Sequence, residues 1–217
     1  MNYKSEFIKF MVGSGVLTFG DFITKSGRKT PYFVNTGNFN TGAQIGRLGR
    51  FYAECIMDNV KAGKLNGDIK ALFGPAYKGI SIAVSASIAL SEGFGKDVCS
   101  SFNRKEEKDH GEGGEIVGYK FRDGDSIVII EDVITAGTAV REVLPIIKKQ
   151  ADVTVCGLII SVDRMEKGQG NKTATQEIKE EFGIDTFPIV TVREIIDEID
   201  IDNDTKNRME DYIKLYC

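Results

Sequence analysis

The sequence of 217 residues contains one histidine and four cysteines, none of them in a CxxC pair. A Cys/His zinc site needs several of these ligands at close spacing, so such a site is not expected. We expect Cys55, Cys99, Cys156 and Cys217 to be free thiols in a reducing compartment. The sequence also lacks a GxxxxGK[ST] loop and a GxGxxG segment after a strand, which excludes the two best-known nucleotide-binding loops.

Long apolar runs and excess positive charge are absent as well. No run of 18 apolar residues occurs, and residues 1–15 do not have the apolar centre of a signal peptide. We therefore expect a cytoplasmic protein that does not cross a membrane. The 28 Lys and Arg residues against 32 Asp and Glu give a net charge of -4, which argues against nucleic acid or an anionic membrane as partner. A local cluster of cations could still bind an anionic small molecule.

From residue 69 onward, apolar segments alternate with helical patterns. Runs such as SIVII (126–130) and VCGLIIS (155–161) do not alternate with polar residues, which is typical of strands covered on both faces. The pattern predicts an α/β fold with a mainly parallel central sheet flanked by helices. We expect one domain over residues 1–217, with an N-terminal hood of strands and helix (about 1–65), a core sheet (about 66–200) and a C-terminal helix (201–217).

Helical spacing supports several of these helices. Thr41 is expected to cap a helix over residues 42–60, and Val140, Val143, Leu144 and Ile147 form an apolar stripe on another. A third stripe consists of Ile80, Ala83, Val84, Ser87 and Ile88.

The segment SIVIIEDVITAGTAV (126–140) ends an apolar strand on two carboxylates, Glu131 and Asp132. Small residues and hydroxyls follow where the next helix should begin, and backbone N–H groups there can bind a phosphate. Two carboxylates would repel that phosphate unless the ligand also carries hydroxyls or a metal ion, as a ribose phosphate does. The alternative is that the acids only cap the helix. The combination of apolar strand, acid pair and Thr-Ala-Gly-Thr favours the ribose phosphate.

VIIEDVITAGTA (128–139) resembles the 5-phosphoribosyl 1-diphosphate (PRPP) motif of type I phosphoribosyltransferases. Within that group, five separate segments between about residues 19 and 170 resemble orotate phosphoribosyltransferases. The resemblance implies the fold of that family and transfer of the phosphoribosyl group from PRPP to orotate, giving orotidine 5′-monophosphate and pyrophosphate in pyrimidine biosynthesis. It also implies Mg²⁺ held mainly by substrate oxygens, with no dedicated protein ligands, and a homodimer in which a lid loop reaches the partner's site.

The resemblance assigns roles to individual residues. The residues expected to bind PRPP are Lys25, Tyr77, Lys78, Arg104, Lys105, Lys108, His110, Glu131, Asp132, Val133, Ile134, Thr135, Ala136, Gly137, Thr138 and Ala139. The residues expected to bind orotate are Phe33, Val34, Thr135 and Arg164. The catalytic residues are expected to be Arg104, Lys105, Lys108, His110 and Asp132.

The residue types suit these roles. FGPAYKGI (73–80) is a glycine-rich turn with a lysine, and the cations and glycines of segment 102–118 suit a mobile lid over a leaving pyrophosphate. The guanidinium of Arg164 can hold a carboxylate, such as that of orotate, in a two-pronged grip. Taken singly, each segment also fits a plainer interpretation: an ordinary turn, a solvated charged surface, or a surface ion pair.

Three other functions stay open. The first is a phosphoribosyltransferase for a purine or for uracil, against which Arg164 and segment 25–34 argue. The second is a non-catalytic PRPP-sensing regulator, which should carry a basic face or a DNA-binding domain, whereas this chain has a pI of about 5.2. The third is a different phosphate-binding α/β enzyme, against which the acid pair and the cationic segment argue.

Overall fold

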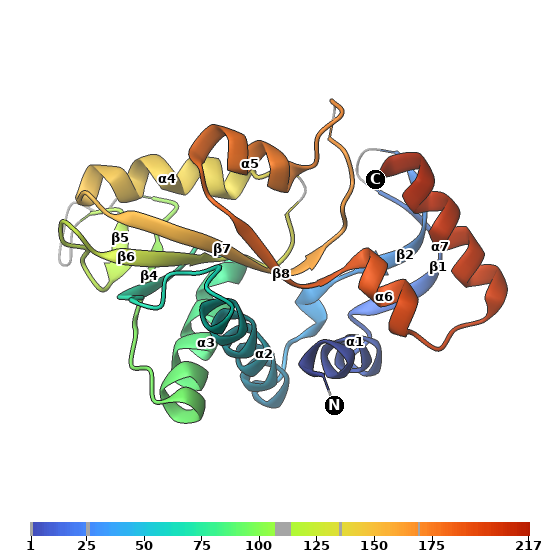
Figure 1. The fold of residues 1–217 in the computed structure, drawn as a ribbon, viewed down its shortest axis with the longest axis horizontal. Helices are drawn as coiled ribbons and strands as arrows, with labels where there is room; N and C mark the ends of the chain where they lie inside the picture. The colour runs from blue at the N-terminus through green and yellow to red at the C-terminus, as the bar shows by residue number, and fades with distance from the viewer. Residues whose placement is uncertain (1, 25–26, 107–113, 135, 169) are drawn as a thin grey trace.

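A six-stranded sheet forms the centre of the protein in a computed structural model of the chain (Figure 1). The structure describes residues 2–24, 27–106, 114–134, 136–168 and 170–217. The strand order is β5-β4-β3-β6-β7-β8, and all neighbours are parallel except β4 and β5. These strands are β3 (Ala71–Gly74), β4 (Cys99–Asn103), β5 (Ile116–Gly118), β6 (Ser126–Ile130), β7 (Thr154–Asp163) and β8 (Thr186–Thr191). The predicted, mainly parallel sheet is confirmed.

Helices cover both faces of this sheet. In Figure 1, α4 (Thr138–Gln150) and α5 (Ala174–Phe182) lie on one face, and α2 (Gly42–Lys61) and α3 (Lys78–Phe94) lie on the other. The central strands β3 and β6 therefore bury both sets of side chains. On β6, Ile127 and Ile129 pack in the cluster with α4, whereas Val128 and Ile130 pack in the cluster with α2 and α3. This arrangement explains why the strand has no polar alternation.

The remaining elements form a separate layer at one end of the molecule (Figure 1). They are α1 (Tyr3–Gly13), the antiparallel hairpin of β1 (Leu17–Ile23) and β2 (Lys29–Val34), the short 3-10 helix η1 (Thr36–Asn38), α6 (Val192–Glu198) and α7 (Asn203–Tyr216). The C-terminal helix packs on the N-terminal hairpin: the rings of Tyr32 on β2 and Tyr212 on α7 meet edge to face at 5.8 Å. Arg208 on α7 also pairs with Asp21 on β1.

Local signals predicted most helices correctly. Thr41 caps α2, and Thr41 and Gln44 form a reciprocal capping box. The helix expected after β3 is α3, but two of its apolar residues, Val84 and Ile88, are 39% and 53% exposed. The face of α3 that is buried is rotated about the helix axis relative to the predicted apolar stripe. The strand β5 was not predicted, because a strand of three residues is too short for a periodic pattern.

Within the described ranges, no helix has both the length and the apolarity needed to cross a bilayer.

Candidate active site

The predicted acid pair lies directly after β6, at the carboxyl-end edge of the parallel strands. Glu131 is only 9% exposed. Its main-chain carbonyl accepts a hydrogen bond of 2.7 Å from the Tyr52 hydroxyl, and its side chain accepts one of 2.9 Å from the backbone N–H of Asp132. Ser161 on β7 donates through its hydroxyl to the Asp132 carbonyl at 2.6 Å. These bonds fix the backbone of both acids.

The Asp132 carboxylate meets two side chains from other segments. The Lys78 ammonium, at the start of α3, lies 2.8 Å from Asp132 Oδ2, and the Thr36 hydroxyl donates to the same oxygen at 2.6 Å. Lys78 also donates to Thr36 Oγ1 at 3.0 Å. Lys78, which is predicted to bind the diphosphate, and Asp132, which is predicted to bind the ribose, are therefore in direct contact.

The environment moves the pKa values of the two acids in opposite directions. Burial raises the pKa of Glu131 to about 8, and the nearby Asp132 carboxylate adds to this rise. Burial alone would also raise the pKa of Asp132, but hydrogen bonds from Lys78 and Thr36 outweigh it and lower that pKa. The lowered pKa favours the ionised form of Asp132, whereas the raised pKa favours the protonated form of Glu131.

Two glycines bring the turn after β3 against the end of β6. A Cβ atom on Gly74 would lie 2.1 Å from the Gly79 carbonyl oxygen, and one on Gly79 would lie 2.8 Å from the Ile130 carbonyl oxygen. Only glycine fits this close approach. The Asn103 side chain accepts a hydrogen bond of 2.8 Å from the Ala76 N–H, which ties the turn to the end of β4.

The chain between the acids and α4 is described except at residue 135. Val133 pairs with Val162 of β7, and Gly137 adopts a left-handed conformation (φ 68°) immediately before α4 begins at Thr138. Thr138 and Ala136 are exposed, whereas Ile134 and Ala139 are half-buried. No side chain caps the N-terminus of α4, so within the described residues its first N–H groups have no side-chain cap partner. Thr135 lies outside the described residues.

The structure describes only the two ends of the cationic segment after β4. The Arg104 N–H donates to the Glu115 carbonyl at 2.7 Å, which joins the two ends of the segment. The Lys105 ammonium lies 3.8 Å from the Glu142 carboxylate on α4. Lys108 and His110 lie outside the described residues, so their predicted roles are not tested.

The residues that are expected to bind orotate lie in the β1–β2 hairpin and after β7. Phe33 is 39% exposed and stacks on Phe22 at 5.5 Å, and Val34 is half-buried against the core. Arg164 follows the end of β7, and its guanidinium lies 5.0 Å from the centre of the Tyr32 ring. Exposed Tyr77 precedes Lys78 in the turn after β3. Lys25 lies outside the described residues.

The sequence interpretation did not single out Thr36, Asn103, Tyr52 or Ser161. Each is polar and lies at or near the end of a strand or on a helix that faces that end, and each fixes a site residue by a hydrogen bond. Asn103, the last residue of β4, carried the clearest signal, because polar residues at the carboxyl ends of parallel strands tend to serve the site. In the helical pattern of the sequence, Tyr52 cannot be distinguished from the apolar residues of α2.

Residues 35–191 match the family model described as a phosphoribosyl transferase domain. The orotate phosphoribosyltransferase of Clostridium beijerinckii is 56% identical over 99% of this chain and 97% of its own, and that of Clostridium acetobutylicum is 51% identical over the same shares. A crystal structure of the Francisella tularensis orotate phosphoribosyltransferase superposes with a TM-score of 0.85, at 34% identity, over 97% of this chain and 98% of that one.

The matched range includes the acid pair, the Lys78 turn, the phosphate loop and Arg164. The identity extends over nearly the whole chain rather than over one motif. The chain therefore belongs to the orotate phosphoribosyltransferase family, within the phosphoribosyl transferases.

Proposed function

We propose that this protein transfers the 5-phosphoribosyl group of PRPP to a ring nitrogen of orotate, giving orotidine 5′-monophosphate and pyrophosphate for pyrimidine biosynthesis. The observation that carries the proposal is the contact of Lys78 with Asp132, directly before the phosphate loop and α4. Family membership supports the same reaction.

Each part of the site has a physical task in this reaction. The turn of residues 134–138 would bind the 5′-phosphate with backbone N–H groups and the α4 N-terminus. Glu131 and Asp132 would hold the ribose hydroxyls, and the negative charge of Asp132 would lie near the oxocarbenium-like centre that glycosyl transfer develops at C1′. The raised pKa of Glu131 favours its protonated form, which can donate a hydrogen bond to a hydroxyl without adding a second negative charge.

The leaving pyrophosphate needs positive charge. Lys78, Arg104, Lys105, Lys108 and His110 are the proposed donors, with Lys78 moving from Asp132 to the diphosphate when PRPP binds. No nucleophilic side chain is required, because positioned charges supply the catalysis.

We propose Mg²⁺ as the metal, bound as its complex with PRPP. Among the described residues, no three His, Cys, Asp or Glu side chains are grouped as a metal site. Mg²⁺ commonly takes most of its ligands from substrate phosphates and water, with one or two protein carboxylates. Here Asp132 is the carboxylate best placed to help, because it carries the charge of the acid pair.

We further propose a homodimer in which the segment of residues 104–113 reaches the partner's site. The proposal rests on the resemblance, and exposed Val84 and Ile88 on α3 give an apolar surface that a second copy could cover. A single domain with the hood, core and C-terminal helix described above, and a cytoplasmic location, stay predictions.

The test of the reaction is the loss of orotate absorbance with Mg²⁺, compared with and without PRPP. We expect consumption only when PRPP is present, together with formation of orotidine 5′-monophosphate. Parallel assays with uracil, adenine and hypoxanthine decide between this reaction and a phosphoribosyltransferase for another base. PRPP-dependent consumption of one of those bases instead of orotate would overturn the proposal.

A further inference from the structure

Arg164 is already held by a neighbouring acid. Its Nε donates to Glu166 Oε1 at 2.8 Å, and its Nη2 lies 2.6 Å from the same oxygen, an ion-pair contact that lacks hydrogen-bond alignment. The two side chains are only 12% and 20% exposed. A guanidinium presents several donor edges, so an acid on the Nε/Nη2 edge leaves Nη1 for a second anion.

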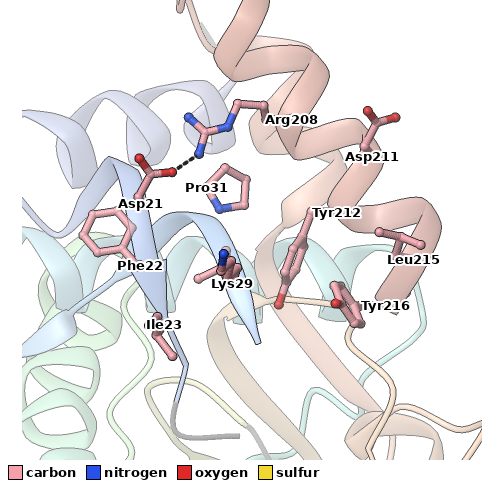
Figure 2. Close-up of a pocket in the computed structure, with 11 residues that line it drawn as sticks. Asp21, Phe22, Ile23, Lys29, Pro31, Arg208, Asp211, Tyr212, Leu215 and Tyr216 are labelled. Carbon is pink, nitrogen blue, oxygen red and sulfur yellow. Dashed lines mark hydrogen bonds and ion pairs between the residues drawn. The ribbon is translucent and has the colours of Figure 1, made fainter. Parts of the chain in front are cut away.

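The same oxygen of Glu166 has a third partner, from the far end of the chain. The Tyr212 hydroxyl on α7 donates to Glu166 Oε1 at 2.8 Å. Burial raises the pKa of Tyr212 to about 12, and the Glu166 carboxylate adds to this rise, so the hydroxyl keeps its proton to donate. Figure 2 shows Tyr212 reaching from α7 toward β2, beside Tyr216. The C-terminal helix thus contacts the acid that holds Arg164.

Tyr32 completes the surroundings of the guanidinium. Its ring lies 5.0 Å from Arg164 Cζ and edge to face with Tyr212, and the side chain is fully buried. Its hydroxyl has no hydrogen-bond partner among the described residues. Together the two tyrosines limit the directions in which Arg164 can rotate.

The backbone at Arg164 is constrained as well. Met165, the next residue, adopts a positive φ of 57°, which a side chain other than glycine seldom does. The Asp163 side chain accepts a hydrogen bond of 2.8 Å from the Met165 N–H and so supports this conformation. Strained backbone of this kind persists where the surrounding structure over-determines it, often at a functional site.

We propose that Glu166 and Tyr212 are positioning residues, which hold Arg164 in the orientation that receives the carboxylate of the base. The inference rests on the proposed function, because it requires that the base carries a carboxylate. Tyr212 fixes one oxygen of Glu166 and so keeps Glu166 on the Nε edge. Without Tyr212, Glu166 is free to turn toward the rest of the guanidinium and compete with the substrate carboxylate.

The deciding variant is Tyr212→Phe, which keeps the ring packing and removes only the hydroxyl. We expect the KM for orotate to rise about tenfold, while the KM for PRPP and kcat stay within about twofold. The matched control is Tyr216→Phe, one turn further along the same helix, which is expected to leave all three constants unchanged. Glu166→Ala should give a larger rise in the orotate KM, and Tyr212→Phe decides alone if that variant does not fold.

Two further measurements separate positioning from a general effect on structure. Wild type should be inhibited far more strongly by orotidine 5′-monophosphate than by uridine 5′-monophosphate, which lacks the carboxylate, and Tyr212→Phe should reduce this ratio. In an Arg164→Ala background, Tyr212→Phe should add no further rise in the orotate KM, because the group it positions is gone.

The outcomes distinguish the two proposals. If the unsubstituted protein does not consume orotate with PRPP, the proposed function fails. If the unsubstituted protein is active but Tyr212→Phe leaves the orotate KM and the inhibition ratio unchanged, the positioning role alone is wrong. Equal losses for orotate and PRPP would also overturn it, since a purely structural contact would affect both substrates.

Discussion

The Lys78 ammonium lies 2.8 Å from the Asp132 carboxylate, although 54 positions separate the two residues in the chain. This contact joins the turn after β3 to the end of β6, which are neighbouring strands in the sheet. In the proposed reaction, Lys78 binds the diphosphate of PRPP and Asp132 binds its ribose. Binding of PRPP therefore exchanges an internal ion pair for contacts with the two halves of one substrate.

Lys78→Ala should separate stability from activity. The lysine side chain is 56% exposed, and an ion pair of this kind contributes about 1 kcal/mol or less to the free energy of unfolding. We expect little change in urea denaturation but a rise of about tenfold in the KM for PRPP, because a charged contact with the diphosphate is lost. Exposed Lys64→Ala is the control. Unchanged kinetics in Lys78→Ala would remove Lys78 from the PRPP site.

The raised pKa of Glu131 predicts a pH dependence of stability. Between its ordinary value of 4.5 and about 8, the folded protein holds a proton that the unfolded chain has released. The folded state then binds more protons, so the free energy of unfolding falls as pH rises through this window, by a few kcal/mol at most. Asp132 does not oppose this change, because its pKa is lowered from 3.8.

Urea denaturation of wild type and Glu131→Gln at pH 5 and pH 8 measures this effect. The glutamine keeps the size of the side chain and cannot titrate, so the decrease in stability should be smaller in the variant. An equal decrease in both proteins would show that Glu131 is already ionised when folded.

Lys108→Ala tests the cationic segment. Charge that acts mainly on the transition state is worth about 3 kcal/mol, or roughly a hundredfold in rate. We expect kcat to fall far more than PRPP binding weakens, as measured by steady-state kinetics and by direct PRPP titration. Equal kcat in wild type and variant at saturating substrate would refute a catalytic role for Lys108.

Arg164→Ala should raise the KM for orotate strongly and spare the affinity for PRPP. Arg164→Lys is expected to restore little, because an ammonium cannot hold Glu166 on one side and the substrate carboxylate on the other as a planar guanidinium can. Circular dichroism of both variants guards against misfolding, since Glu166 loses its ion-pair partner in Arg164→Ala. An unchanged orotate KM would remove Arg164 from the base site.

Two glycines of α3 allow a matched test of packing. Gly79→Ala would place a Cβ 2.8 Å from the Ile130 carbonyl oxygen and is expected to destabilise the protein by about 2 kcal/mol. Gly93→Ala meets nothing within 4 Å and should be neutral or stabilising by up to about 1 kcal/mol, because alanine favours the helix. Similar unfolding free energies for both variants would contradict the close approach of β6 and the β3 turn.

The sequence by itself determined the α/β class, the order of the main strands and helices, and the position of the acid pair at a strand end. These features follow from local periodicity and from the run of residues 126–140, which depend on neighbours in the chain. The same local view did not determine which face of α3 is buried, since Val84 and Ile88 fit the helical stripe but are exposed.

Only the tertiary structure decided which side chains meet. Lys78 and Thr36 reach Asp132 because β3 lies beside β6 and the hairpin folds over that edge, and sheet order is not encoded in spacing along the chain. Likewise, Tyr212 contacts Glu166 across 46 positions because α7 packs on β2. The chemistry of each residue is local, but the contacts that orient it form only when distant segments are packed together.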